Sequence, residues 1–159
     1  MTAVGSYLPA NVVTNEALSS FVDTDDAWIR RRTGIAQRHL VAEGETTSDL
    51  AYHAAVKALA NAGLTGGDID LIIIATTTPD NTFPSTATKL QHMIEAKGAI
   101  AFDIQAVCAG FVYALDIADA MLQSGRGRRA LGVGAESFSK LLDGEDRRNC
   151  GLRGDGAGG

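Results

Sequence analysis

Residues 99–111 read Ala-Ile-Ala-Phe-Asp-Ile-Gln-Ala-Val-Cys-Ala-Gly-Phe. The first six predict a buried strand, and the apolar residues that follow Cys108 predict a helix. The cysteine thus stands where a strand passes into a helix, among first-turn N–H groups that lack an acceptor within the helix. Such groups favour the thiolate, which is the form that attacks acyl carbon, so Cys108 is a candidate nucleophile. A free cysteine is as often a small buried apolar residue, and from the residues alone both interpretations stay open.

Two further apolar runs, at 71–76 and 130–135, also predict strands covered on both faces, as in a parallel sheet. A further strand is expected around Val4. Helical patterns alternate with these runs, and we expect helices over residues 23–32, 47–62, 84–98 and 109–124. The helix at 109–124 is apolar on nearly every side, which predicts burial. Strand and helix in alternation predict an α/β sheet with right-handed crossovers.

Composition narrows the functional classes. The chain has 159 residues, of which 45% are hydrophobic and 21% are charged, and this is ordinary for a folded globular protein. A net charge of -5 argues against a nucleic-acid partner. The N-terminus lacks a basic segment and a long apolar stretch, so we expect no secretion, no membrane insertion and a cytoplasmic location. Cys108 and Cys150 match neither a disulfide framework nor a metal site.

Several short segments together resemble one family. The chain is similar to the N-terminal half of β-ketoacyl-acyl carrier protein synthase III, a condensing enzyme with the thiolase fold. The segments that carry this resemblance are Gly5-Ser-Tyr-Leu-Pro, Asp26-Ala-Trp-Ile, Arg32-Thr-Gly-Ile, Ala75-Thr-Thr-Thr-Pro, Phe83-Pro-Ser-Thr-Ala, Phe102-Asp-Ile-Gln-Ala-Val-Cys-Ala-Gly-Phe and Gly154-Asp-Gly-Ala-Gly. The resemblance implies a thiolase-like α/β half-domain over residues 1–159, with a mostly parallel sheet covered by helices and a buried central helix after Cys108. It also implies that the C-terminal half is absent.

The resemblance further implies an activity and partners. Such enzymes initiate fatty acid synthesis by moving an acyl group from coenzyme A to the cysteine, here Cys108. They then condense that group with malonyl-acyl carrier protein and release carbon dioxide. A homodimer is expected, and no cofactor is expected apart from the coenzyme A thioester, which is a substrate.

Other positions take roles from the same resemblance. Trp28 corresponds to a residue that stacks on the adenine of coenzyme A, and Arg147 to one on the adenine's other face. Arg32 fits a contact to the nucleotide phosphates, and Thr24 belongs to the same mouth. Phe83 corresponds to a residue that reaches across the dimer to the partner's acyl pocket. From the residues alone, Trp28 would be a half-buried packing residue, Arg32 a helix-dipole partner, and Phe83 an apolar contact ahead of the helix at Pro84.

The chain departs from the family in two ways. The family's cysteine works with a histidine and an asparagine of the C-terminal half, and the three histidines here match no such motif. We therefore expect His39, His53 and His92 to be solvated surface residues, and the 159 residues alone to be inactive. Gly151 and Arg153 also weaken the apolar strand expected at 150–153. Residues 154–159 satisfy G-x-G-x-x-G, but this poor strand argues against a dinucleotide site.

Two alternatives remain at the level of the sequence. One is an acyltransferase on the same fold that passes the acyl group to a hydroxyl or amine without decarboxylation. The other is a half-domain without catalytic activity that serves in dimerisation or binding. A reactive Cys108 thiol would favour an enzyme over the second alternative, since structural buried cysteines are inert.

Overall fold

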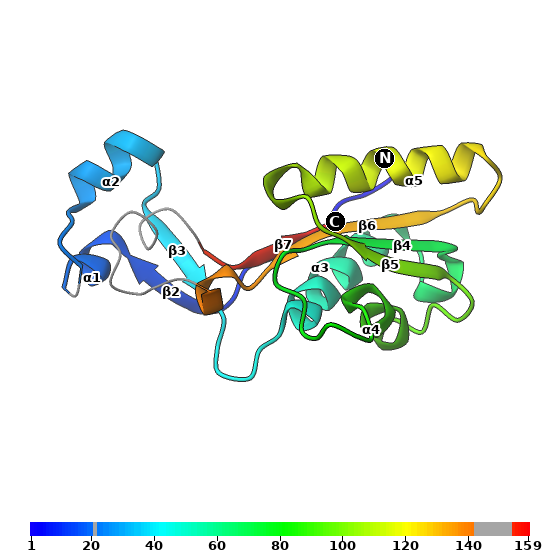
Figure 1. The fold of residues 1–159 in the computed structure, drawn as a ribbon, viewed down its shortest axis with the longest axis horizontal. Coiled ribbons are helices and arrows are strands. Elements are labelled where there is room, and N and C mark those ends of the chain that lie inside the picture. Colours follow the sequence, from blue (N-terminus) through cyan, green and yellow to red (C-terminus); the bar gives the residue numbers. More distant parts are fainter. Residues whose placement is uncertain (21, 142–153) are drawn as a thin grey trace. The chain divides into compact units, whose positions relative to one another are not determined.

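The structure is a computed structural model that describes residues 1–20, 22–141 and 154–159. These residues divide into two compact units (Figure 1). The first unit consists of Met1–Tyr7, Thr46–Glu136 and Ala157–Gly159, and the second of Leu8–Glu45 and Ser137–Gly156.

The first unit is built on a five-stranded sheet in the order β1-β7-β6-β4-β5. Its strands are β1 (Ser6–Tyr7), β4 (Leu71–Ala75), β5 (Ile100–Ile104), β6 (Ala130–Glu136) and β7 (Gly156–Gly158). β4 pairs in parallel with both β5 and β6, and every one of its residues is buried, as the unbroken apolar run predicts. β1 and β7 pair antiparallel. The three runs predicted as strands do form strands, but the predicted burial holds only for β4, because β5 has no buried residue and β6 alternates between buried and half-buried positions. The pairing of β7 is one that the sequence did not indicate.

Helices cover both faces of this sheet. Figure 1 shows α5 (Gly110–Gln123) on one face and α3 (Thr47–Ala62) with α4 (Thr86–Met93) on the other. The larger apolar core lies between β4, β6 and the α3–α4 layer, and a smaller core lies under α5. The described part of the chain contains no helix with the length and apolar character needed to span a bilayer.

α3 has the bounds that the sequence predicts. Thr46 forms a capping box with Asp49, in which the hydroxyl and the carboxylate each accept from the other residue's backbone N–H. Gly63 ends the helix with a left-handed φ of 66°, which glycine adopts without strain. The close approach of β1 to this helix also requires a glycine. A Cβ on Gly5 would lie 2.3 Å from the Ala54 carbonyl oxygen.

α4 is shorter than the predicted 84–98. It begins after the Ser85 cap, and the Asp103 carboxylate of β5 accepts from the Thr86 and Ala87 N–H groups at 2.7 Å each. It ends at Met93, and Glu95 takes a left-handed φ of 58°. The prediction that Pro84 opens this helix is wrong, because the serine and the tertiary contact to Asp103 decide where it starts.

α5 corrects the expectation of a buried helix. A 3-10 turn at Val107–Ala109 precedes it, and only Gly110, Ala114 and Ala118 are buried. Val112 remains 64% exposed because only one stripe of the helix contacts β4 and β6. An apolar composition therefore did not by itself specify burial.

The second unit contains a short antiparallel ribbon and two helices. β2 (Asn11–Thr14) pairs with β3 (Gln37–Leu40), and these strands are joined by α1 (Asn15–Ser19) and α2 (Asp26–Thr33); a 3-10 turn, η3 (Phe138–Leu141), belongs to the same unit. α2 starts three residues later than predicted because Asp25 caps it, its carboxylate accepting from the Trp28 N–H at 2.7 Å. Gly34 ends it at a φ of 74°.

Asp155 ties the second unit together. Its carboxylate accepts from the Val41 N–H and the Ser139 N–H, each at 2.8 Å, and the side chain is buried. A Cβ on Gly154 would lie 3.1 Å from the Arg38 Cβ, which explains a glycine at this position. The same segment continues into β7, so it forms a strand rather than the helix start that a dinucleotide loop needs.

Candidate functional site

Cys108 lies four residues beyond the end of β5, in the 3-10 turn that leads into α5. Its thiol is free and exposed. Ala109, at the N-cap position of α5, provides no side-chain hydrogen bond to the helix. The 3-10 turn before the helix nevertheless uses some backbone donors, since the Ala109 N–H donates to the Ala106 carbonyl at 3.1 Å and the Gly110 N–H to the Val107 carbonyl. Because the thiol is exposed, the alternative of a buried cysteine is not what the structure contains.

The residue before the cysteine is strained. Val107 has a φ of 49°, in the left-handed region that β-branched residues rarely enter. Such a conformation costs on the order of 1–3 kcal/mol and persists where the surroundings hold it. Strain of this kind is concentrated at functional sites, and here it is adjacent to the candidate nucleophile.

Two glycines allow α5 to pack closely against the sheet. A Cβ on Gly110 would lie 3.0 Å from the Ala75 Cβ of β4, so the first turn of the helix lies very close to that strand. A Cβ on Gly134 would lie 3.5 Å from the Phe111 Cβ, which puts β6 under the same turn. The start of α5, and with it Cys108, is thus positioned on the carboxyl ends of β4 and β6. In parallel α/β sheets, ligands bind at this edge.

The turn after β4 carries a polar network that the sequence analysis did not assign. The Thr78 carbonyl accepts from the Thr47 hydroxyl at 2.6 Å, and the Asp80 carboxylate accepts from the Ser48 N–H at 3.0 Å and the Ser48 hydroxyl at 2.5 Å. Lys89 Nζ also lies 3.0 Å from Asp80. The signal that could have identified these residues is their place, since polar side chains that directly follow a buried parallel strand lie at the ligand edge of the sheet.

Two opposing effects act on Asp80. Burial raises the pKa of this carboxyl group, but the hydrogen bonds from Ser48 and the ammonium group of Lys89 favour the charged form more strongly. The net result is a pKa lowered from its ordinary value. Asp80 is therefore a carboxylate that fixes the loop between β4 and α4 rather than a proton donor.

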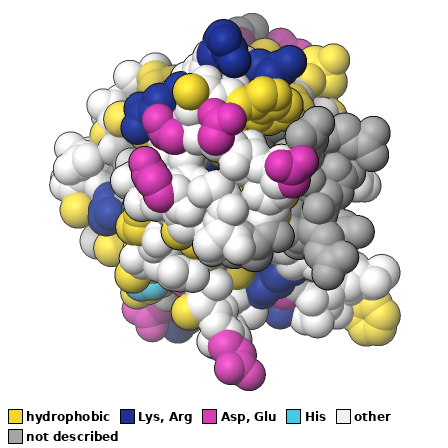
Figure 2. Space-filling model, turned by 90° about the vertical axis from the view of Figure 1, so that its left-hand side faces the viewer, with side chains coloured by type: hydrophobic (Ala, Val, Ile, Leu, Met, Phe, Trp, Pro, Cys, Tyr) yellow, Lys and Arg dark blue, Asp and Glu magenta, His cyan; other side chains and the backbone are white. Residues whose placement is uncertain are grey.

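The predicted coenzyme A residues lie in the second unit. The Arg32 guanidinium lies over the Trp28 ring, 4.3 Å from its centroid, and Trp28 packs against the small core around Ile29. Thr24 has a buried hydroxyl oxygen with no hydrogen-bond partner. Figure 2 shows basic side chains beside apolar ones at the top of this face, where α2 lies in Figure 1. Arg147 lies outside the described residues, as do Cys150, Gly151 and Arg153.

The structure also tests the predicted exposure of Phe83 and of the three histidines. Phe83, in the first unit, is 84% exposed, so it does not pack as the apolar contact that the residues alone suggest. His53 and His92 are exposed, as predicted. The prediction for His39 is wrong, because His39 is half-buried in β3 with its Nδ1 2.6 Å from the Pro9 carbonyl oxygen. No set of three or more metal-ligating side chains comes together among the described residues.

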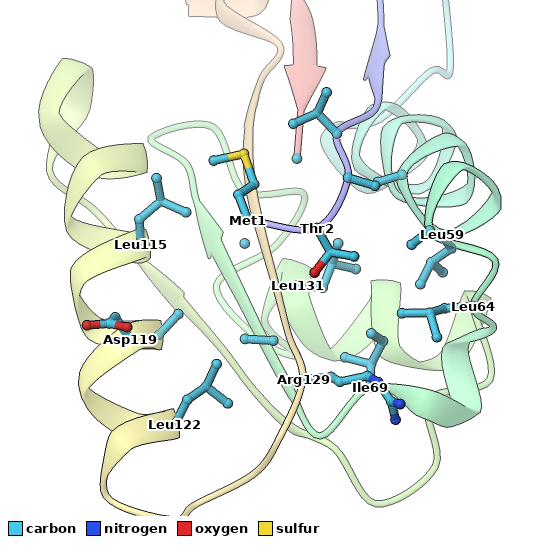
Figure 3. Close-up of a pocket in the computed structure, with 18 of the residues that line it drawn as sticks. Met1, Thr2, Leu59, Leu64, Ile69, Leu115, Asp119, Leu122, Arg129 and Leu131 are labelled. Carbon is cyan, nitrogen blue, oxygen red and sulfur yellow. The ribbon is translucent and has the colours of Figure 1, made fainter.

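A cavity of about 640 Å³ lies in the first unit, and Cys108 does not line it. Its walls come from α5, from α3, from Met1–Val4 and from the Ala130–Gly132 segment of β6. Figure 3 shows Leu115 and Leu122 on one side, Leu59 and Leu64 on the other, and Leu131 between them. The cavity is therefore mainly apolar and separate from the candidate nucleophile.

Known proteins share both the sequence and this architecture. A family model described as 3-Oxoacyl-[acyl-carrier-protein (ACP)] synthase III matches residues 102–159. The chain is 59% identical over 154 residues to the beta-ketoacyl-[acyl-carrier-protein] synthase III of Paramagnetospirillum magneticum, and this match covers 97% of the chain and 48% of the relative. It is 60% identical over 155 residues to the enzyme of the same name from Rhodospirillum rubrum, with the same coverage of 97% and 48%.

The crystal structure of 3-oxoacyl-[acyl-carrier-protein] synthase III from Aquifex aeolicus VF5 has the same thiolase-like α/β fold. It superposes with a TM-score of 0.95 at 50% identity, over 99% of this chain and 51% of that one. The chain spans about half the length of the curated relatives it matches. By sequence and by fold, the chain is similar to the N-terminal half of the β-ketoacyl-[acyl-carrier-protein] synthase III enzymes.

Proposed function

We propose that this chain supplies the nucleophile of an initiating condensing enzyme of fatty acid synthesis, acting in the cytoplasm as a homodimer. The observation that carries the proposal is the exposed Cys108 thiol in the turn before α5, on the ligand edge of a parallel sheet. The names of the relatives support this reaction class. The substrates would be an acyl-coenzyme A and malonyl-acyl carrier protein, and no further cofactor is required.

The first stage is transfer of the acyl group to Cys108. The thiolate sulfur attacks the thioester carbonyl carbon, a new carbon–sulfur bond forms, and the bond to the coenzyme A sulfur breaks. The coenzyme A thiolate leaves and takes up a proton. The positive end of the α5 dipole would stabilise negative charge near the sulfur, and two easier steps replace one difficult transfer.

The second stage is decarboxylative condensation. The malonyl carboxylate leaves as carbon dioxide, and the electron pair of the broken bond attacks the acyl carbon held on Cys108. The carbon–sulfur bond to Cys108 then breaks, which restores the thiolate. Negative charge develops on the thioester oxygen of the malonyl group, and in the family a histidine and an asparagine of the C-terminal half donate hydrogen bonds to it.

Binding of the nucleotide part of coenzyme A is proposed for Trp28, Arg32, Arg147 and Thr24. The stacked Arg32–Trp28 pair offers a planar cation and an indole, which suit phosphate and adenine. Thr24 is assigned to the same site by the resemblance, and its buried hydroxyl oxygen has no hydrogen-bond partner within the described residues. Phe83, highly exposed, is proposed to enter the acyl pocket of a partner subunit.

The test is direct detection of the acyl-enzyme. Intact protein is mixed with acetyl-coenzyme A, quenched in acid, digested and analysed by mass spectrometry. We expect an acetyl group on the peptide that contains Cys108, loss of that product in Cys108→Ser, and its retention in the matched control Cys150→Ser. Acetylation of Cys150 instead, or of neither cysteine, would overturn the proposal.

A further inference from the structure

Glu136, the last residue of β6, is the centre of a polar cluster that neither the nucleophile nor the coenzyme A residues explain. Its Oε1 accepts from the Thr77 N–H at 2.8 Å and from the Thr77 hydroxyl at 2.8 Å. Its Oε2 accepts from the Thr78 hydroxyl at 2.6 Å, and the Thr76 hydroxyl lies 3.5 Å away. Glu136 is half-buried, and no described lysine or arginine forms an ion pair with it. Its carboxylate is thus committed to the turn after β4.

The alternation along β6 places Glu136 on the face of the strand that α5 covers. Alternate residues of β6 face α5, since Gly132 lies under Leu115 and Gly134 under Phe111. Two strand residues advance about 6.6 Å and four helix residues about 6 Å, so the two series stay in step. The next member of the strand series is Glu136, which therefore lies beyond Gly134 toward the start of α5.

The cluster also reaches Cys108 along the chain. The Thr76 N–H donates to the Ile104 carbonyl at 3.1 Å, which joins the end of β4 to the end of β5. Cys108 follows Ile104 by four residues, and the first turn of α5 rests on Ala75, the residue before Thr76. The turn that Glu136 binds contacts the nucleophile's segment at two places. Thr76 binds the end of β5, and Ala75, next to it, packs against Gly110 at the start of α5.

We propose that Glu136 is a positioning residue for Cys108. By accepting the hydrogen bonds of Thr77 and Thr78, its carboxylate fixes the ends of β4, β5 and β6, and this keeps Val107 and the thiol in one orientation. Glu136 exchanges no proton in the reaction. The catalytic meaning of this role rests on the proposed function, whereas the effect on the thiol itself does not.

The experiment is single-turnover acylation of Cys108 in the intact protein with saturating acetyl-coenzyme A. In Glu136→Ala we expect the rate constant to fall about 10-fold or more, because small misplacements of a reacting atom have effects of this order. The amplitude should stay close to one acetyl group per folded chain. Glu136→Gln should recover most of the rate constant, since its amide oxygen still accepts from Thr77 and its NH₂ group can donate to the Thr78 hydroxyl.

Asp68→Ala is the matched control. The Asp68 carboxylate also accepts from a threonine, the Thr65 N–H at 2.9 Å and hydroxyl at 2.8 Å, but it precedes β4 at the other end of the sheet. This variant should leave the rate constant unchanged. A purely structural role for Glu136 would lower the amplitude, through loss of folded molecules, with an unchanged rate constant. That result, or equal rate constants for Glu136→Ala and wild type, would overturn the inference.

A parallel measurement separates this inference from the proposed function. The rate constant for alkylation of Cys108 by iodoacetamide is followed in the same variants by mass spectrometry of the Cys108 peptide. If wild type reacts with iodoacetamide but not with acetyl-coenzyme A, the proposed function fails, and the alkylation series still decides the role of Glu136. We expect Glu136→Ala and Thr78→Val to change the alkylation rate constant non-additively, as members of one network do.

Discussion

Among the aspartates with a lowered pKa, Asp80 is the one that fixes the loop between β4 and α4. Its pKa lies below the ordinary value of 3.8 because hydrogen bonds from Ser48 and the charge of Lys89 outweigh burial. A carboxyl group whose pKa is lower in the folded state contributes stability that is complete above the unfolded pKa. That contribution is lost as the pH falls through the folded pKa.

Asp80→Asn should therefore flatten the acid limb of the stability curve. We expect wild type to lose unfolding free energy as the pH falls below the ordinary pKa of 3.8, and the variant to lose less over the same range. Urea unfolding at a series of pH values measures both curves, and Ser48→Ala, which removes one of the donors, should give an intermediate slope. Parallel curves for wild type and Asp80→Asn would contradict the assignment of this pKa.

The contact proposed for Trp28, stacking on the adenine of coenzyme A, is remote from the reacting carbon. Trp28→Ala and Arg147→Ala should raise KM for acyl-coenzyme A with little change in kcat, since the lost contact is equal in the ground and transition states. Steady-state kinetics of the intact enzyme against acyl-coenzyme A give the comparison. A fall in kcat with an unchanged KM would remove the adenine-stacking role.

At the scale of elements, the contact between α5 and the sheet decides where the nucleophile stands. Two glycines under or in this helix differ in the space that they leave. A Cβ on Gly110 would meet the Ala75 Cβ at 3.0 Å, whereas a Cβ on Gly132 would meet Leu115 at 3.7 Å, an ordinary van der Waals distance. Only the first approach is tighter than an ordinary Cβ contact, so the Ala75 side chain would have to shift.

Gly110→Ala and Gly132→Ala should thus have opposite effects. We expect Gly110→Ala to lower the unfolding free energy by about 1 kcal/mol, since overpacking outweighs the better helix propensity of alanine. Gly132→Ala should be neutral or stabilise by up to about 1 kcal/mol, because it reduces the entropy of the unfolded chain. Urea titrations measure both, and acylation of Cys108 should slow only in Gly110→Ala. Equal behaviour of the two variants would mean that the Ala75 contact yields without cost.

At the scale of the whole molecule, the second stage of the proposed reaction needs donors to the malonyl thioester oxygen, and each described histidine has another partner or is exposed. A positioned donor to a developing oxyanion typically contributes about 3 kcal/mol to the barrier. His39 is bound to Pro9, His53 stacks on Tyr7 with ring centroids 4.6 Å apart, and His92 is exposed on α4. None of these three histidines is close in sequence to the turn that contains Cys108.

The 159-residue chain alone should therefore release no carbon dioxide from malonyl-acyl carrier protein. The assay uses radiolabelled malonyl carboxyl carbon, with a full-length relative as positive control. Measurement of the mass in solution accompanies it, because Val112 and Tyr113 on α5 are 64% and 54% exposed and favour self-association. A soluble monomer with condensing activity would refute the assignment of the missing donors.

The sequence by itself determined the parts of this protein that depend on neighbouring residues. The apolar runs of β4, β5 and β6, the Thr46 cap and Gly63 stop of α3, and the strand–turn–helix around Cys108 are all readable within a few positions. These elements can be predicted because continuous apolar runs, helix caps and glycines with a left-handed φ each depend on a few neighbouring residues. The candidate nucleophile was identified for the same reason.

Only the tertiary structure decided what depends on distant segments. Gly5 and Gly159 exchange backbone hydrogen bonds of 2.8 and 2.9 Å although 153 residues separate them, and α4 is placed by Asp103. The link from Glu136 to Thr77 and Thr78 likewise joins two strands that are separate in the chain. No local propensity encodes these contacts, because a backbone or carboxylate group binds whichever partner the fold brings within reach.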